Sequence, residues 1–203
     1  MTPPPPSARK PSENRAKLVA AARALFARQG YADTGTEQIV REAGITRGAL
    51  YYQFEDKRDL FRAVCVDVME GVVGRLWSET MGGSTREEDE LVVGSRLLLQ
   101  YYSEPEIRRI LLVDGPAVLG FEEWRRVTEP LGLALLNHAL EHQVAAGRLP
   151  GEQAPATAQL LLGALSQAGL AIGASADPEA TRDRFVAGLG ALLSGLGAEP
   201  PTN

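Results

Sequence analysis

Apolar side chains recur every three or four positions near the start of the chain. Between Glu13 and Gly30 the repeat runs through Leu18, Ala21, Ala22, Leu25 and Phe26. This spacing places the apolar residues on one face of an α-helix. We therefore expect an amphipathic helix that begins at about Glu13, packs through this face and ends near Gly30.

A second, shorter apolar run ends at Ala43 and is followed by two residues that favour a turn. Gly44 adopts positive φ without strain and is predicted to end one helix, while the Thr46 hydroxyl can cap the next. A short helix then begins at about Arg47 and presents hydrogen-bond donors from its first turn. Two short helices joined in this way are typical of a helix-turn-helix, whose second helix enters the major groove of DNA.

Helical periodicity continues to the end of the chain. Asp56 is predicted to cap a long helix that extends through Leu60 and Phe61 toward Trp77. Asp114-Gly115-Pro116 and Pro130 are expected to interrupt the later helices. The remaining predicted helices are Thr85 to Tyr102, a short one from Pro105 to Leu112, Leu131 to Ala146, Ala154 to Gly173 and Pro178 to Leu196, and a segment around Gly120 to Val127 precedes Pro130. The fold class is therefore all-α.

The stretch from Leu160 to Gly173 is apolar on nearly all sides of its predicted helix. Such a helix must be covered on more than one face. The core of the subunit can cover one face and a second subunit another. The small residues Gly163, Ala164, Ala168 and Gly169 permit close approach of neighbouring helices.

Composition places the chain among globular proteins. It has 203 residues, of which 44% are hydrophobic, and we identify neither a membrane-spanning run nor an N-terminal signal segment. We therefore expect a cytoplasmic protein that does not associate with a membrane. We expect no cofactor. The single cysteine, Cys65, lies in an apolar run, which favours a buried structural thiol over a redox sensor. Residues 1–12 are rich in proline and are predicted to form a disordered arm.

The charge is unevenly distributed along the chain. Up to Arg62 there are 11 Lys and Arg against 7 Asp and Glu, giving +4, whereas the remainder has 10 against 19, giving −9. A basic first part can bind phosphate and an acidic second part is repelled by it. The overall charge of −5 therefore does not argue against nucleic-acid binding.

Residues 14 to 62 resemble the DNA-binding domain of the tetracycline-repressor (TetR) family of transcriptional regulators. The resemblance rests on Ala24-Leu25-Phe26, Gly30-Tyr31, Thr34, Thr36, Ile39-Val40, Ala43-Gly44-Ile45, Leu50-Tyr51-Tyr52, Phe54, Lys57 and Leu60-Phe61. Two positions depart from the family pattern: Gly35 stands where Thr or Ser is usual, and Gln53 where His is frequent. Because Gly35 has no hydroxyl group, the resemblance implies a phosphate contact only for Thr36.

The resemblance and the residue types together predict which residues contact DNA. Arg47 can bind guanine or a phosphate, Gly48 permits close approach to a base or sugar, and Ala49 can contact a thymine methyl. The positions that match phosphate-binding positions of the family are Thr36, Thr46, Tyr51, Tyr52 and Lys57. Of the two tyrosines, Tyr51 is expected to be partly packed. Gln53 is a weak candidate for a phosphate or water contact.

His138 and His142 stand at i and i+4 on a predicted helix, a spacing that can bind zinc. The sequence identifies no third ligand, so a surface or structural pair is favoured and no metal is expected. We find neither a nucleophile signature nor a glycine-rich phosphate loop. We therefore do not expect an enzyme.

Aromatic and polar residues in the second half suggest a small-molecule pocket, although each of them can equally belong to the core. The candidates are Tyr101, Tyr102, Asp114, Phe121, Trp124 and Asn137. Asp114 can alternatively cap the helix that follows it.

These observations predict a TetR-like regulator, most simply a repressor, that binds a palindromic operator as a homodimer and is released by a small molecule. The expected organisation is an arm at 1–12, a DNA-binding domain at 13–60 and a ligand-binding and dimerisation domain at 61–203. The alternative is a small-molecule sensor or protein-interaction module that does not bind DNA specifically. Operator footprinting separates the two.

Overall fold

The computed structural model describes residues 12–81 and 90–194, and every regular element in these ranges is helical. The predicted all-α fold class is confirmed for this part of the chain. The chain forms two compact units that divide after Val64, inside the long helix α4 (Lys57–Met81). The predicted arm up to residue 11, the predicted helix start at Thr85 and the predicted helix end at Leu196 lie outside the described residues.

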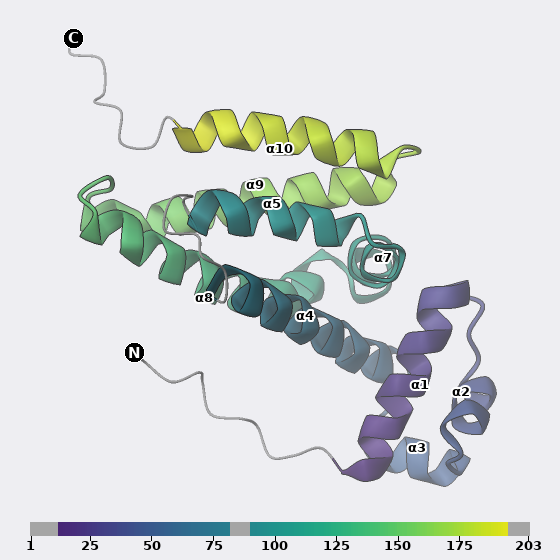
Figure 1. Cartoon of the computed structure of the whole chain (residues 1–203). Coiled ribbons are helices and arrows are strands. Elements are labelled where there is room, and N and C mark those ends of the chain that lie inside the picture. The colour runs from purple at the N-terminus through teal and green to yellow at the C-terminus, as the bar shows by residue number, and fades with distance from the viewer. Residues whose placement is uncertain (1–11, 82–89, 195–203) are drawn as a thin grey trace. The chain divides into compact units, whose positions relative to one another are not determined.

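The first unit contains α1 (Glu13–Gln29), α2 (Thr36–Ala43), α3 (Arg47–Gln53) and the start of α4 (Figure 1). The apolar face predicted for α1 is buried, and its Phe26 meets Phe61 of α4 edge to face with ring centroids 5.2 Å apart. Ile39 and Leu50 bring α2 and α3 to the same core, where neither is accessible to solvent. One small apolar core therefore fixes the three short helices.

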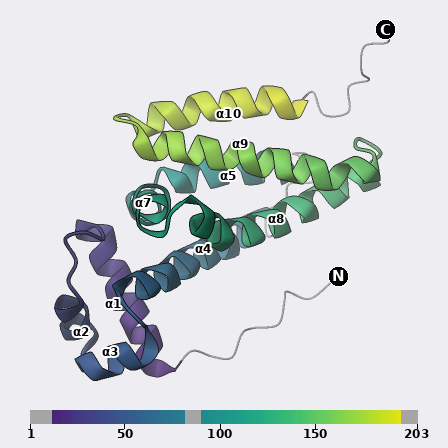
Figure 2. The same ribbon diagram turned by 180° about the vertical axis from the view of Figure 1, so that it is seen from behind.

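The second unit is built around α9, which packs against α5, α8, α10 and the π-helical turn η1 (Figure 2). Its elements after α4 are α5 (Glu90–Tyr102), α6 (Pro105–Ile107), η1 (Arg108–Asp114), α7 (Gly115–Leu119), α8 (Phe121–Ala145), η2 (Gly151–Gln153), α9 (Ala154–Ala174) and α10 (Pro178–Ser194).

The small residues of α9 divide between two faces. Gly169 and Gly173 are buried, and a Cβ atom on them would lie 2.8 Å from the Tyr102 ring and 2.9 Å from Leu112 Cβ, respectively. Gly163 and Ala164 are exposed. One face of α9 therefore packs tightly inside the subunit, and the opposite face is uncovered.

At two positions where the sequence predicts an interruption of a helix, the chain stays helical. Helix α8 continues through Pro130, whose side chain is exposed, so water can reach the backbone where proline cannot donate a hydrogen bond. At Asp114 the chain changes from η1 to α7 without leaving a helical conformation. Packing decides this second junction, because a Cβ atom on Gly115 would lie 2.9 Å from Trp124 Cδ1.

The segment Gly151–Ala174, which includes α9, is long and apolar enough to cross a membrane by length and composition. The sequence-based expectation of no membrane-spanning run is therefore not met by length and composition alone. Length and composition are weak evidence for a span, since the central helix of a globular core meets the same criteria. The packing of α9 against α5, α8, α10 and η1 accounts for its apolar sequence on the inner face.

Candidate DNA interface and the cavity of the second unit

The turn between α2 and α3 has the geometry predicted from its residues. Gly44 is left-handed, with φ 64° and ψ 32°, and its N–H lies against the carbonyls of Val40 and Arg41. The Thr46 hydroxyl oxygen accepts a hydrogen bond of 3.3 Å from the N–H of Ala49. Both features are local, and together they set the direction in which α3 leaves the turn.

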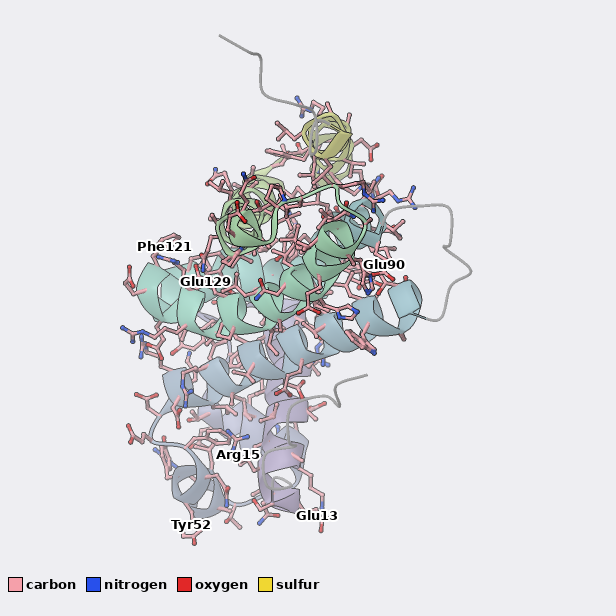
Figure 3. The ribbon with its side chains drawn as sticks, turned by 90° about the vertical axis from the view of Figure 1, so that its left-hand side faces the viewer. Glu13, Arg15, Tyr52, Glu90, Phe121 and Glu129 are labelled. Atoms are coloured by element: carbon pink, nitrogen blue, oxygen red, sulfur yellow. The ribbon has the colours of Figure 1, made fainter. Side chains whose placement is uncertain are left out.

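Helix α3 has one buried and one exposed side. Leu50 and Phe54 are buried, whereas Tyr52 is 87% exposed and Tyr51 45% exposed. Tyr52 extends from the helix into solvent (Figure 3). Tyr51 is the more covered of the two, as expected, and the Arg47 guanidinium lies 5.6 Å from its ring centroid.

The first turn of α3 exposes the candidate base-contacting residues. Arg47 Nη1 donates to Glu37 Oε1 at 2.8 Å, and both side chains are largely exposed. Such a surface ion pair contributes little free energy, so Arg47 can exchange Glu37 for phosphate or guanine at small cost. Gly48 is exposed, and a Cβ atom there would meet nothing within 4 Å. Internal packing therefore does not require glycine at this position, and Ala49 beside it is half-buried.

The two threonines of the candidate set occupy helix starts. Thr36 is the first residue of α2 and is half-buried, and Gly35 before it makes no side-chain cap. Thr46 is exposed and uses its oxygen as an acceptor, which leaves its hydroxyl proton able to donate to a phosphate.

Lys57 has a role inside the first unit that the sequence did not reveal. Its Nζ donates to the carbonyls of Tyr31 and Thr34, each at 3.0 Å, and lies 4.0 Å from the centroid of the Tyr31 ring. The ammonium group therefore ties the start of α4 to the loop between α1 and α2. A phosphate contact by Lys57 stays a prediction and would have to use its remaining N–H.

Two further polar contacts hold this unit together. Thr34 is buried and its hydroxyl donates to the carbonyl of Gly30 at 2.7 Å. Ser12 donates to Gln53 Oε1 at 3.2 Å, which joins the end of α3 to the start of α1. The sequence indicates only a weak phosphate or water contact for Gln53, because no local signal points to a partner 41 residues away along the chain.

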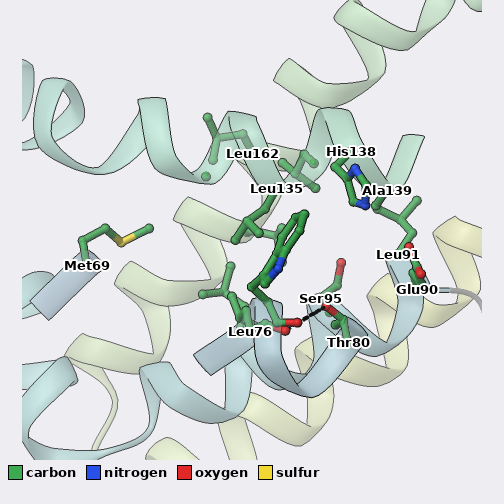
Figure 4. A pocket seen from close by; sticks show the side chains of 16 residues that line it. Met69, Leu76, Thr80, Glu90, Leu91, Ser95, Leu135, His138, Ala139 and Leu162 are labelled. Carbon is green, nitrogen blue, oxygen red and sulfur yellow. Dashed lines mark hydrogen bonds between the residues drawn. The ribbon is translucent and has the colours of Figure 1, made fainter. Parts of the chain in front are cut away.

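The second unit contains an apolar cavity between α4, α5, α8 and α9 (Figure 4). Its volume is about 60 Å³, which is room for several waters or part of a small ligand. The few polar groups on its wall include Thr80, whose hydroxyl donates to the Leu76 carbonyl at 2.8 Å. The cavity is lined by Met69, Leu76, Trp77, Thr80, Glu90, Leu91, Gly94, Ser95, Leu98, Gly132, Leu135, Leu136, His138, Ala139, Leu162 and Leu165.

The aromatic ligand candidates lie outside the lining of this cavity. Tyr101 and Tyr102 are buried in α5, and Trp124 is buried with its indole N–H donating to the Leu111 carbonyl at 2.7 Å. Phe121 is 55% exposed and borders, with Trp124, a separate hollow along α8 and α9. The structure thus brings Phe121 and Trp124 together and leaves the two tyrosines in the packed interior.

The polar ligand candidates also lie apart from the cavity lining. Asp114 is half-buried and stands before α7, but it makes no side-chain cap. Asn137 is exposed on α8. Whether any of the six candidates contacts a ligand stays a prediction.

Cys65 is a buried free thiol, as predicted. Burial raises its pKa to about 12, so almost no reactive thiolate exists at neutral pH. Its Sγ lies 3.9 Å from the carbonyl of Ile110, in a packed part of the second unit.

Comparison with known proteins places both units in one family. Residues 18–64 match the family model described as "Bacterial regulatory proteins, tetR family", and residues 89–196 match "Tetracyclin repressor-like, C-terminal domain". A solved TetR-family transcriptional regulator from Pectobacterium atrosepticum is 33% identical, with a TM-score of 0.80 over 95% of this chain and 100% of that one.

Two proteins of Pseudomonas putida are similar over most of their length. The probable HTH-type transcriptional regulator ArpR is 30% identical over 153 residues, covering 69% of this chain and 70% of the relative. The HTH-type transcriptional regulator SrpR is 28% identical over 145 residues, covering 71% and 67%, respectively. The helix-turn-helix geometry, the helical second unit and these matches agree, and the chain belongs to the TetR family of DNA-binding transcriptional regulators, which are not enzymes.

Proposed function

We propose that this protein is a homodimeric repressor that binds a pseudo-palindromic operator through α3 and releases it when a small molecule occupies the second unit. The observation that carries the proposal is the exposure pattern of α3: Arg47, Gly48 and Tyr52 face solvent while Leu50 is buried. A helix fixed in this way presents donors and a close-approach glycine to the major groove. The repressor would act in the cytoplasm, where its operator is found.

The uneven distribution of charge supports an orientation in which the first unit faces DNA. The residues up to Arg62 sum to +4 and the remainder to −9, so only the first unit is attracted to the phosphate backbone. In a two-fold dimer the two copies of α3 would read half-sites about 34 to 36 Å apart.

Footprinting tests the proposal directly. Purified full-length protein is first used to select binding duplexes from a random pool, and the selected sequence is then footprinted. We expect a protected palindrome with two half-sites one helical turn apart. Binding without sequence preference would instead support the alternative of a sensor or interaction module that does not read DNA.

Tyr52→Phe is expected to weaken binding about fivefold on operator and non-operator DNA alike. The variant removes one exposed hydroxyl and with it one neutral hydrogen bond to phosphate, worth about 1 kcal/mol. The slope of log K against log salt should not change, because a hydroxyl displaces no counterion. Titrations at several salt concentrations provide the measurement.

Tyr51→Phe is the matched control, since Tyr51 is the more covered tyrosine and lies beside Arg47. It is expected to have the smaller effect. If Tyr52→Phe lowers the affinity only for operator DNA, Tyr52 contacts a base, and the proposed phosphate contact is contradicted.

Dimerisation is supported by the outer face of α9. From Ala154 to Ala174 the helix contains no charged residue, yet it exposes Gly163, Ala164 and Leu160, the last of them 75% exposed. Leu192 of the adjacent α10 is 68% exposed. Helices α9 and α10 run antiparallel (Figure 2), with Leu160 near the start of α9 and Leu192 near the end of α10. Large exposed apolar side chains on neighbouring helices are typical of a subunit interface.

The cavity between α4, α5, α8 and α9 is the proposed effector site. Its wall is mainly aliphatic, and it contains Ser95, whose buried hydroxyl has no hydrogen-bond partner among the described residues. Apolar walls with a few unpaired polar atoms suit a small, largely apolar molecule that carries a hydrogen-bonding group.

Gly94→Val is expected to abolish the response to effector and to preserve operator binding. Gly94 lines the cavity, and a Cβ atom there would meet only Thr80 Cγ2 at 3.8 Å, an ordinary contact. The valine side chain would occupy space at the cavity wall that a ligand would use, and its Cβ atom makes no close contact. A panel of small aromatic compounds is screened by thermal shift on the unaltered protein, and those that bind are repeated on the variant.

Gly71→Val is the control, because it adds the same side chain at an exposed position of α4 with nothing within 4 Å. It should respond to every compound as the unaltered protein does. Thermal shifts that persist in Gly94→Val would place the effector elsewhere, beginning with the hollow beside Phe121 and Trp124.

A further inference from the structure

Three metal-ligating side chains meet where the start of α5 approaches the last turns of α8. Glu90, His138 and His142 each offer one ligand atom, and these atoms all lie within 4.8 Å of one another. Glu90 Oε2 and His142 Nδ1 are 2.7 Å apart, and the two imidazole rings have centroids 4.9 Å apart. The sequence shows the two histidines as an i, i+4 pair, and the structure adds a carboxylate from a distant part of the chain.

The environment of His138 indicates more than an ion pair between Glu90 and His142. Its Nε2 is buried and has no hydrogen-bond partner among the residues that the structure describes. The ring packs against Trp77, with centroids 5.0 Å apart, which restricts its orientation. A buried nitrogen without a partner is costly, and ligation of a cation is one of the ways in which proteins satisfy it.

We propose that Glu90, His138 and His142 bind a divalent transition-metal ion of the zinc type at the rim of the apolar cavity. Two imidazoles and one carboxylate are ligands that Zn²⁺, Co²⁺, Ni²⁺ and Cu²⁺ accept, whereas Mg²⁺ and Ca²⁺ prefer oxygen. Ligand atoms about 2.1 Å from one tetrahedral ion lie about 3.4 Å from each other, so a pair separated by 4.8 Å would have to close by about 1.4 Å. The half-exposed His142 can supply that movement.

Three protein ligands leave a fourth position for water or for a donor atom of a bound molecule. Glu90 and His138 both line the cavity between α4, α5, α8 and α9, so the ion would form its polar end. It would also link α5 to α8 across the cavity. This site goes beyond the proposed repressor function and rests on its own geometry, so a failure of operator binding would leave it unaffected.

The composition of the chain makes the site simple to test. It contains two histidines and one cysteine in all, and the cysteine is buried. Untagged protein therefore has no other imidazole or accessible thiolate with which to bind a transition metal. Of its two tryptophans, Trp77 lies against the proposed site and Trp124 is hydrogen-bonded to Leu111.

The experiment titrates untagged, chelator-treated full-length protein with Zn²⁺ by calorimetry and with Cu²⁺ by tryptophan fluorescence. We expect one ion per chain with micromolar or tighter affinity. Cu²⁺ should quench the emission of Trp77, and Trp77→Phe should remove most of that quenching. Mg²⁺ should produce no heat above dilution.

Single-ligand variants decide whether the ion sits at this cluster. His142→Ala, at a half-exposed position, should lower Zn²⁺ affinity at least about tenfold, the loss that is common even for partners of metal ligands, and so should Glu90→Gln. Glu141→Gln, which removes an exposed carboxylate next to His142, should bind as the unaltered protein does.

His138→Gln with His142→Gln removes every imidazole and should abolish binding, and circular dichroism establishes that each variant is folded. Absence of Zn²⁺ binding at micromolar concentrations to folded, unaltered protein would overturn the proposal. Affinity that is unchanged in folded His142→Ala would do the same, because the ion would then be held by carboxylates elsewhere.

Discussion

Leu160→Glu is expected to convert the protein into a monomer and to reduce operator affinity by at least about a hundredfold. In a two-fold dimer the substitution occurs twice in one interface, and each carboxylate would be desolvated on an apolar surface or placed near its copy. A cost of about 3 kcal/mol or more corresponds to this loss. Leu160 is 75% exposed in the subunit, so the fold of the monomer should be retained. Sedimentation velocity at micromolar concentration and operator titration provide the two measurements.

The choice of position matters because α9 has two different faces. Leu161 and Leu165 are 8% and 3% exposed, so a glutamate at either would disrupt the subunit core and could not distinguish unfolding from dissociation. Val92→Glu on α5 is the matched control, since Val92 is an exposed apolar residue outside the α9 and α10 face. It should remain dimeric. Unaltered protein that sediments as a monomer, or Leu160→Glu that sediments as a dimer, would contradict the proposed interface.

Lys57→Met is expected to lower the stability of the first unit by about 2 kcal/mol, because it removes two charged hydrogen bonds and a cation–π contact. Methionine keeps most of the side-chain length and removes only the ammonium group. Both tryptophans belong to the second unit, so fluorescence would not report this change. Peptide-resolved hydrogen exchange, followed in α1 and α3, is the appropriate measurement.

Lys17→Met is the control for the loss of a lysine charge. Lys17 is exposed and pairs with Glu13 one turn earlier in α1, a type of surface pair that contributes about 0.5 kcal/mol or less. Exchange protection in Lys57→Met equal to that in Lys17→Met would refute the internal role of Lys57. The salt dependence of DNA binding tests whether Lys57 also contacts phosphate. If it does, Lys57→Met should reduce the slope of log K against log salt by about 0.9. If Lys57 has only its internal role, the slope should not change.

The helix-turn-helix could be predicted from the sequence because its signals are local. Gly44 ends α2 in a left-handed conformation and Thr46 caps α3, and both depend on residues within one turn of the helix. The amphipathic pattern of α1 and the cap by Asp56, whose Oδ1 accepts from the N–H of Asp59 at 2.7 Å, are of the same kind. The all-α fold follows from the same periodicity.

Helix junctions in the second unit were less predictable. Proline is in general unfavourable inside a helix, but Pro130 lies on an exposed side of α8, where water can reach the backbone carbonyl that loses its donor. The change of helix type at Asp114 depends on the approach of Trp124 to Gly115. Such a contact between residues of different elements leaves no periodic trace in the sequence.

The family, the helical class and the outward residues of α3 could be predicted from local signals, because turn chemistry and periodicity operate over a few residues. Which side chains face the cavity depends on packing, since a cavity is the space that four helices leave between them and is lined here largely by aliphatic and small residues such as Gly94. The same applies to the two carbonyls bound by Lys57 and to Glu90 beside His138 and His142. These contacts join residues far apart along the chain, and their free energies depend on distances that only packing sets.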